Sequence, residues 1–375
     1  MSRLRVLVVQ PYAENGGSES WLLKILDATD ALDVEVLLLK DGPMRGELER
    51  RGVPVQLRPV GTSPRDLVAP VRELAARLRR DRPDVVLGNV LKAQLVAGPA
   101  GRLAGVPTVW AKHDHGYDGP LAVALGRVST RVVAAVEELG DPVRRRDVVI
   151  VPPPRPDAPP APREAARAHL AGLGVPLDDA PTAVMAGRLV PFKGVDDALR
   201  ALVRPEAAAW RLVVAGTDDH SSPGETDRLR GLAAELGVAG RVHFAGHVAG
   251  VSHWLAAFDA LLVLTRPGGP RDPGKEGFGT SAFEAMLAGV PVVAVEGGAV
   301  VRRLEGRAGV GVPPSAPGEV AAALARLGDP AVRAAMGRAG QEITADAPDA
   351  AACAALLVEV LRDAASRGRQ ARRRR

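Results

Sequence analysis

Residues 275–295 have the sequence KEGFGTSAFEAMLAGVPVVAV, which passes from a glycine-rich loop through an apolar helix pattern into a β-branched strand pattern. A loop that leads into a helix N-terminus offers unpaired N–H groups and a partial positive charge, which favour a phosphate group. Glu276 precedes the predicted helix, and Glu284 lies about one turn inside it. The pattern therefore predicts a diphosphate held between two carboxylates, one accepting hydrogen bonds from sugar hydroxyls and the other from ribose hydroxyls.

Glu284 also has a purely structural interpretation. Ser281 and Glu284 have the spacing of a capping box, in which the glutamate only satisfies the start of the helix. From the residues alone, the structural and the binding roles of Glu284 are equally supported. Glu276 has no such alternative, because it lies among glycines outside any predicted helix.

The composition is that of a globular protein with two domains. The chain has 375 residues, enough for two separate cores, and it is 46% hydrophobic and 25% charged. No apolar run approaches the length of a membrane span, and the N-terminus runs directly into a strand pattern without a signal peptide. The single cysteine, Cys353, excludes an intrachain disulfide and fits the cytoplasm.

The net charge of +5 comes in large part from the arginine-rich residues 367–375. Such a run predicts a solvated, disordered tail, and attraction to anionic membrane lipid is the minority hypothesis. Nucleic-acid binding is disfavoured, because no aromatic residues lie among these arginines.

Strand and helix patterns alternate on both sides of the proline-rich segment Pro152–Pro162, which reads as an extended linker. Continuous apolar strands between helices indicate parallel sheets that are buried on both faces. The fold class predicted is therefore α/β, with two doubly wound Rossmann-like domains facing each other across a cleft and a C-terminal helix that could return to the first domain. The predicted boundaries are 1–153 for the first domain, 154–180 for the linker and its following helix, 181–348 for the second domain, 349–366 for the terminal helix and 367–375 for the tail.

Arg188 and Lys193 follow the first predicted strand of the second domain and bracket a short loop. Ligands of doubly wound sheets bind beyond the carboxyl ends of the strands. By themselves the two residues fit ordinary solvated cations slightly better. Beside Glu276 and Glu284, however, they can neutralise a diphosphate and stabilise it as a leaving group.

Two segments of the first domain also follow predicted strands. Gly16 and Gly17 follow the first strand and permit close approach of a ligand to the backbone, although a plain turn is the simpler interpretation. His113 follows the fifth strand, where a buried, hydrogen-bonded histidine is the common alternative to a functional one. The spacing of His113, Asp114 and His115 places no ligand set on one face of a regular element, so a metal site is not predicted.

The glutamate pair resembles the E-x7-E element of retaining glycosyltransferases with the GT-B fold, in particular family GT4. The stretch Gly187–Gly194 resembles the family's G-R-L-x-x-x-K-G element, Gly16–Glu19 its first-domain glycine loop, and His113 its cleft histidine. Three features differ from the family pattern: the prolines of the linker, the absence of a glutamate after Gly297-Gly298, and the segment Arg266–Gly274. These differences concern the identity of donor and acceptor more than the reaction type.

The resemblance implies a donor site in the second domain and an acceptor side in the first. It gives His113, Arg188, Lys193 and Glu276 as candidate catalytic residues. The candidate donor-binding residues are Gly16, Gly17, Arg188, Lys193, Glu276, Gly277, Phe278, Gly279, Thr280, Ser281 and Glu284. No Asp-x-Asp sequence occurs in the chain, so neither a metal nor another cofactor is expected.

The function expected from these features is transfer of a hexose-type sugar from a nucleotide-diphosphate sugar to an acceptor hydroxyl, with retention and without a metal. The acceptor could be a sugar, a small molecule or a lipid-linked group. A non-hydrolysing nucleotide-sugar epimerase and an inactive nucleotide-sugar-binding protein are the alternatives. The expected location is the cytoplasm, with the basic tail as a candidate contact to the inner face of the membrane.

Overall fold

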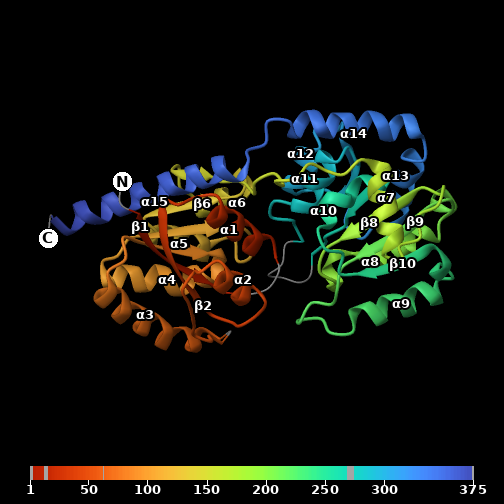
Figure 1. Ribbon diagram of the computed structural model, residues 1–375. Helices are drawn as coiled ribbons and strands as arrows, with labels where there is room; N and C mark the ends of the chain where they lie inside the picture. Colours follow the sequence, from red (N-terminus) through yellow and green to blue (C-terminus); the bar gives the residue numbers. More distant parts are fainter. Residues whose placement is uncertain (1–2, 12–15, 62, 268–273, 374–375) are drawn as a thin grey trace. The chain divides into compact units, whose positions relative to one another are not determined.

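The computed structural model describes residues 3–11, 16–61, 63–267 and 274–373. It divides into two units, which Figure 1 shows in ribbon form. Unit 1 consists of Met1–Arg155 and Pro348–Arg375, and unit 2 of Pro156–Ala347. The boundary between the two units, at Arg155 and Pro156, therefore lies within the proline-rich linker.

Unit 1 contains a parallel sheet that, in the described residues, has the strand order β3-β2-β1-β4-β5-β6-β7. The strands are β1 (Leu4–Gln10), β2 (Leu32–Leu38), β3 (Val55–Leu57), β4 (Val85–Asn89), β5 (Thr108–Lys112), β6 (Arg131–Ala134) and β7 (Val148–Ile150). The helices are α1 (Gly17–Asp27), α2 (Met44–Arg50), α3 (Val68–Asp81), α4 (Val90–Ala104), α5 (Pro120–Val128), α6 (Glu137–Gly140) and α15 (Ala350–Arg373). The order of the strands reverses between β1 and β4, so the carboxyl ends of these two strands flank a switch point.

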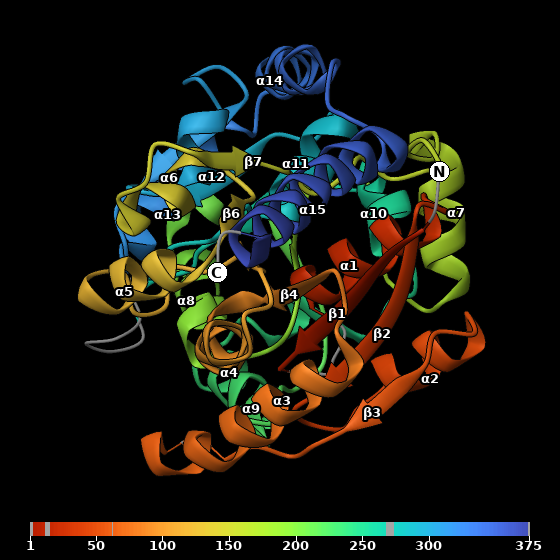
Figure 2. The same cartoon turned by 90° about the vertical axis from the view of Figure 1, so that its left-hand side faces the viewer.

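Alternate residues of the unit 1 strands point to opposite faces, and each face is covered by its own helices. Val6 and Val8 pack in one cluster with α1, α2 and α15, whereas Leu7 and Val9 pack in another with α3 and α4. Figures 1 and 2 show α15, drawn in blue, lying along this unit beside α1. The expected return of the C-terminal helix to the first domain is thereby confirmed.

Unit 2 repeats the arrangement, with the described strand order β10-β9-β8-β11-β12-β13, again parallel throughout. The strands are β8 (Thr182–Ala186), β9 (Arg211–Ala215), β10 (Val242–Gly246), β11 (Ala260–Val263), β12 (Val292–Val295) and β13 (Gly309–Val312). The helices are α7 (Arg163–Gly172), α8 (Val195–Leu202), α9 (Glu225–Glu235), α10 (Val251–Trp254), α11 (Thr280–Leu287), α12 (Ala299–Arg303), α13 (Pro317–Arg326) and α14 (Pro330–Thr344). Its switch point lies between β8 and β11.

The two faces of the unit 2 sheet are also separately covered. Met185 and Leu262 pack in the cluster with α8, α9 and α13, while Val184 and Val263 pack in the cluster with α7, α11 and α12. The predicted fold class, two doubly wound α/β domains, is therefore correct.

The sequence-based assignment of residues 367–375 as a disordered tail is wrong for the part that the structure describes. Helix α15 does not end at 366 but continues to Arg373. Arg367 pairs with Asp363 one turn earlier, and Arg369 pairs with Asp84 at the start of β4. Gly368 lies against Pro107, where an added Cβ would come within 2.7 Å. These contacts with the unit 1 sheet extend the helix beyond its apolar pattern.

Candidate functional site

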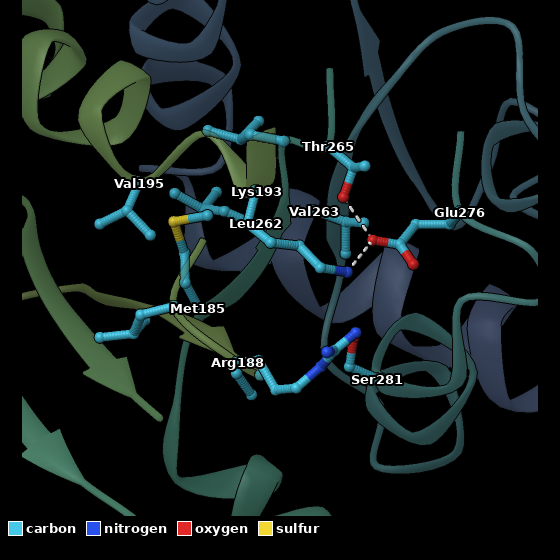
Figure 3. Close-up of a pocket in the computed structure, with 13 residues that line it drawn as sticks. Met185, Arg188, Lys193, Val195, Leu262, Val263, Thr265, Glu276 and Ser281 are labelled. Atoms are coloured by element: carbon cyan, nitrogen blue, oxygen red, sulfur yellow. Dashed lines mark hydrogen bonds and ion pairs between the residues drawn. The ribbon is translucent and has the colours of Figure 1, made fainter. Parts of the chain in front are cut away.

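A pocket lies at the carboxyl edge of the unit 2 sheet, between the ends of β8 and β11 where the strand order reverses. Neighbouring connections run to opposite faces at such a point, which leaves a crevice for a ligand. Four of the predicted residues line the pocket: Arg188, Lys193, Glu276 and Ser281. Figure 3 shows the side chains of Lys193 and Glu276 meeting in it, with Arg188 reaching toward Ser281.

Arg188 follows β8, and its guanidinium forms an ion pair with Asp219, which follows β9. The carboxylate of Asp219 is buried and also accepts hydrogen bonds from the backbone N–H and the hydroxyl of Ser221, at 2.9 and 2.5 Å. Burial alone would raise the pKa of Asp219, but these hydrogen bonds and the charge of Arg188 outweigh it and lower the pKa to about 2. The ionised carboxylate therefore holds the guanidinium at the pocket, while 50% of the Arg188 side chain stays exposed.

Lys193 ends a short 3₁₀ turn, Pro191–Lys193, and is followed by Gly194 in the left-handed region at φ 74°. A Cβ on Gly194 would lie 2.4 Å from the carbonyl oxygen of Leu264, so only glycine lets this loop pack on the end of β11. The loop thereby brings the Lys193 Nζ to 2.5 Å from the Glu276 Oε1.

Glu276 accepts hydrogen bonds on the same oxygen from Lys193 and from the hydroxyl of Thr265, the residue that follows the end of β11 by two positions. Its side chain is 20% exposed. Burial would raise the pKa of Glu276, but the charge and hydrogen bond of Lys193, the hydroxyl of Thr265 and the charge of Arg188 lower it. The site therefore presents an ionised carboxylate between two cations.

Helix α11 begins at Thr280, with Gly279 as its N-cap at φ 73° and with no side chain capping it. Ser281 is thus already inside the helix, so the capping-box interpretation of Ser281 and Glu284 is wrong. The helix starts two residues earlier than a cap at Ser281 requires, because a Cβ at Gly279 would lie 2.3 Å from Val300 and only glycine can take the turn there. Glu284 lies on the second turn of α11 and is partly buried.

The loop between Glu276 and α11 is fixed by an arginine that the sequence did not single out. Arg303, at the end of α12, donates a hydrogen bond of 2.8 Å to the Phe278 carbonyl oxygen, and its guanidinium lies 3.9 Å from the centre of the Phe278 ring. The same ring packs edge-to-face on Phe283 of α11. Gly277 lies between Glu276 and this anchored phenylalanine.

The glycine pair of unit 1 lies at the switch point of that unit's sheet. Gly16 is the N-cap of α1 and Gly17 its first residue, whereas residues 12–15 of the same loop lie outside the described residues. A Cβ on Gly16 would lie 2.4 Å from the Glu19 Oε2. Glu19 accepts a 3.1 Å hydrogen bond from Gln10 at the end of β1, and Gln10 accepts one of 2.6 Å from Asn89 at the end of β4. This buried network fixes the start of α1.

His113 follows β5. Its ring packs edge-on against Trp21, and the centres of the two rings lie 4.6 Å apart. Burial and the adjacent charge of Lys112 lower the pKa of His113 to about 3, so the imidazole is neutral at physiological pH. Its Nε2 is buried and has no hydrogen-bond partner among the described residues. Lys112 is itself fully buried, with its Nζ 2.6 Å from Asp118. The structure thus brings together Arg188, Lys193, Glu276 and Ser281 in one pocket of unit 2, whereas Glu284 does not line it and His113 belongs to unit 1.

Known proteins match this chain over nearly its whole length. Residues 15–177 match the family described as Glycosyltransferase Family 4, and residues 180–329 match that described as Glycosyl transferases group 1. The chain belongs to glycosyltransferase family GT4. The solved structure of Anabaena Alr3699/HepE in complex with UDP-glucose covers 96% of this chain and all of its own, with a TM-score of 0.80 at 22% identity. That likeness confirms the predicted GT-B fold of this GT4 chain.

Relatives of this GT4 chain share parts of their length with it. The D-inositol 3-phosphate glycosyltransferase of Acidothermus cellulolyticus is 32% identical over 275 residues, which are 64% of this chain and 59% of that relative. A GDP-mannose-dependent phosphatidylinositol monomannoside mannosyltransferase of Mycobacterium tuberculosis is 39% identical over 142 residues, which are 36% of this chain and 35% of that relative. The chain thus spans less than two thirds of the length of these curated relatives.

The described part of this GT4 chain lacks two features. In it, no group of three or more histidine, cysteine, aspartate or glutamate side chains is arranged to hold a metal ion. Across the same residues, no helix has the length and apolar character that spanning a membrane requires.

The sequence analysis missed Asp219, Thr265 and Arg303 as parts of the site. Asp219 and Thr265 each follow a strand of the unit 2 sheet, as Arg188 does. The rule that ligand-binding residues follow the carboxyl ends of strands would have found these two. Arg303 carries no local signal, because its contact with Phe278 joins residues 25 positions apart.

Proposed function

We propose that this GT4 chain transfers a hexose-type sugar from a nucleotide-diphosphate sugar to an acceptor hydroxyl, with retention of anomeric configuration. The observation that carries the proposal is the convergence of Lys193 and Thr265 on Glu276, beside Arg188, at the switch point of the unit 2 sheet. A diphosphate brings negative charge to a pocket that holds two cations, and a sugar next to it offers hydroxyl donors to a carboxylate.

Each residue then has a defined task. Arg188 and Lys193 bind the diphosphate and stabilise it as the leaving group, since cations already oriented by Asp219 and Glu276 need little reorganisation during the reaction. The first backbone N–H groups of α11, whose N-cap glycine has no side chain to offer them, are donors for the same charge. Glu276 binds hydroxyls of the transferred sugar, and Glu284 binds the ribose.

The first domain supplies the acceptor side through Gly16, Gly17 and His113. A neutral imidazole with an unpartnered Nε2 can form a hydrogen bond with a sugar hydroxyl without adding a further positive charge to those of Arg188 and Lys193. No carboxylate of the chain is assigned as a nucleophile. Rate enhancement comes from positioning and from leaving-group stabilisation.

The names of similar proteins suggest which donors and acceptors to test. One solved structure binds UDP-glucose, one relative is named for GDP-mannose, and another for D-inositol 3-phosphate. A thermal-shift screen with UDP-glucose, GDP-mannose and ADP-glucose should identify the donor. Transfer to D-inositol 3-phosphate and to simple sugars then tests acceptors, and the proton coupling constant of the product's anomeric carbon gives the stereochemistry.

The alternatives are outcomes of the same assays. Conversion of the donor to its epimer without any acceptor would show that the protein is a non-hydrolysing epimerase and not a transferase. Donor binding with no transfer to any acceptor would leave an inactive nucleotide-sugar-binding protein. We also propose that transfer needs no metal or other cofactor, so EDTA should leave the rate unchanged, and a loss of rate restored by Mg²⁺ or Mn²⁺ would contradict this.

We also propose that the protein is cytoplasmic and contacts the membrane surface through the basic end of α15. Arg367 and Arg369 each keep more than half of their side chain exposed, at 52 and 57%. Removal of residues 369–375 should weaken binding to vesicles of phosphatidylglycerol and leave binding to phosphatidylcholine vesicles unchanged. Equal binding of the full and shortened chains to both vesicles would remove the membrane contact from the proposal.

A further inference from the structure

Arg266 directly follows Thr265 and does not line the donor pocket, yet its guanidinium forms ion pairs with two acids on the first turn of α8. Its Nη2 lies 2.8 Å from both carboxylate oxygens of Asp196, and its Nη1 pairs with Asp197. Both acids are buried, at 7 and 5% exposure. Two buried carboxylates side by side require a cation, and a planar guanidinium can serve both of them at once.

The contacts of Arg266 also fix the loop that carries Lys193. The backbone N–H of Arg266 donates a 2.8 Å hydrogen bond to the carbonyl oxygen of Phe192, next to Lys193. Its Nη2 donates a longer one of 3.3 Å to the carbonyl oxygen of Pro191. Asp196 and Asp197 follow the same loop. Residues that precede Lys193 and residues that follow it are therefore bonded to Arg266.

The segment that carries Glu276 is anchored at the same place. A Cβ on Gly274 would lie 2.1 Å from the backbone carbon of Arg266 and 2.0 Å from the backbone nitrogen of Pro267, so the chain returns directly onto Arg266 just before Glu276. Thr265, the preceding residue, donates its hydroxyl to the Glu276 carboxylate. The two partners of the Lys193–Glu276 ion pair thus originate from segments that both pack on one arginine.

From these contacts we propose that Arg266 is a positioning residue for the donor site, an inference that rests on the proposed function. Arg266 connects the Lys193 loop to the segment of Thr265 and Glu276. It thereby fixes the distance between the Lys193 ammonium, which binds the diphosphate, and the Glu276 carboxylate, which binds the sugar. The Arg266–Gly274 stretch, which departs from the family pattern, thereby gains a role at its first residue.

Arg200 provides a matched control. It also forms an ion pair with Asp196, at 2.9 Å, but it does so from within α8, and 46% of its side chain is exposed. Among the described residues, it makes no hydrogen bond or ion pair with the Lys193 loop or with residues 265–267 and 274–276. Replacing it with lysine therefore perturbs an ion pair of the same acid without touching the connection to the pocket.

The test compares Arg266→Lys with Arg200→Lys, because lysine keeps the charge but cannot bridge two carboxylates with a planar fork. Affinities for UDP, GDP and ADP and for the corresponding monophosphates are measured by calorimetry, and kcat and KM are measured with the donor found by thermal shift. Arg266→Lys should weaken diphosphate binding and lower kcat by roughly 10- to 100-fold, as expected from a small misplacement of reacting groups. In Arg266→Lys, the ratio of diphosphate affinity to monophosphate affinity should also fall. Arg200→Lys should change the affinities, kcat and KM by about twofold or less.

A triple variant, Arg266→Met with Asp196→Asn and Asp197→Asn, guards against simple unfolding, because it leaves no buried charge unpaired. It should keep the melting temperature near that of the wild-type chain and still lose diphosphate affinity. If the wild-type chain binds none of the diphosphates, the proposed function fails and the inference with it. If the wild-type chain binds one and both lysine variants behave alike, or if all nucleotides weaken equally in Arg266→Lys, only the positioning role is overturned.

Discussion

Arg188 is the residue on which leaving-group stabilisation depends most directly. Arg188→Ala should reduce turnover by roughly 100- to 1000-fold, the usual loss when a preorganised donor to developing charge is removed. The melting temperature should change little, because half of the Arg188 side chain is exposed and the buried Asp219 carboxylate keeps its hydrogen bonds from Ser221. Arg230→Ala, which removes an arginine of α9 that is 57% exposed, is the control and should keep full activity. Near-normal transfer by Arg188→Ala would remove the diphosphate role.

Asp219, the partner of Arg188, should make the stability of unit 2 depend on pH in the acid range. The pKa of Asp219 is lowered from 3.8 to about 2 in the folded chain, so its contribution is complete above pH 3.8 and is lost as the pH falls toward 2. The contribution should be about 1 kcal/mol, since solvent screens part of the roughly 2 kcal/mol to which such a shift corresponds.

Denaturant unfolding of the wild-type chain and of Asp219→Asn at several pH values measures this contribution. The difference in unfolding free energy between the two chains should be largest near pH 5 and should shrink between pH 4 and 2. Asp227→Asn, at an aspartate that is 85% exposed, controls for removal of a negative charge from the same unit. A difference that stays constant from pH 5 to 2 would contradict the assignment.

At the scale of elements, the start of α11 depends on the glycine at its N-cap. Gly279 has φ 73°, and a Cβ there would lie 2.3 Å from the Val300 side chain. Gly279→Ala should therefore destabilise unit 2 by about 2–3 kcal/mol, through backbone strain and overpacking, and should shift the Glu276 loop so that donor affinity falls.

The same substitution elsewhere in unit 2 should have the opposite sign. Gly231 lies inside α9 with nothing within 4 Å of an added Cβ. Gly231→Ala should raise stability by up to about 1 kcal/mol, because alanine favours the helix and loses less backbone entropy. Chemical denaturation of both variants tests the pair, and a neutral Gly279→Ala would show that the turn tolerates a side chain.

At the scale of the whole molecule, the chain forms unit 1 from its two ends. Residues of α15, among them Leu357, Leu361 and Ala364, are buried in the cluster that contains Val6, Val8 and Trp21. A chain that ends at Ala347 should therefore expose the apolar face of the unit 1 sheet and lose the cooperative unfolding of that unit. Unit 2, whose clusters contain no residue of α15, should keep its own transition.

Tryptophan fluorescence can follow the two units separately. Trp21 and Trp110 are buried in unit 1, whereas Trp210 and Trp254 belong to unit 2. The double variant Trp210→Phe, Trp254→Phe retains only the tryptophans of unit 1. In the shortened chain, its fluorescence should no longer change in a sigmoidal way with denaturant. The double variant Trp21→Phe, Trp110→Phe retains only those of unit 2, and its fluorescence should keep the sigmoidal change. Two unchanged transitions would mean that α15 is dispensable for unit 1.

The alternation of apolar runs by itself determined the two α/β units and many of their elements. The sequence patterns predict strands at Thr182–Ala186 and Arg211–Ala215 and helices at Pro317–Arg326 and Pro330–Thr344. These bounds agree with those of β8, β9, α13 and α14, because each element is a continuous apolar or periodic pattern set between turn residues. Arg188, Lys193 and Glu276, singled out from their places after a strand and before a helix start, line the same pocket. The short edge strand β3 and the glycine-rich strand β13 were missed, since they lack a continuous apolar pattern and are formed only by pairing with a neighbouring strand.

Only the tertiary structure decided which charged groups meet. The bonds of Arg188 to Asp219, of Lys193 to Glu276 and of Arg266 to Asp197 join residues 31, 83 and 69 positions apart. No local pattern carries that information, because each bond forms where two separate loops reach the same edge of a sheet. The extension of α15 past its apolar repeat has the same cause, since contacts with distant residues of unit 1 stabilise turns that the local sequence leaves undetermined.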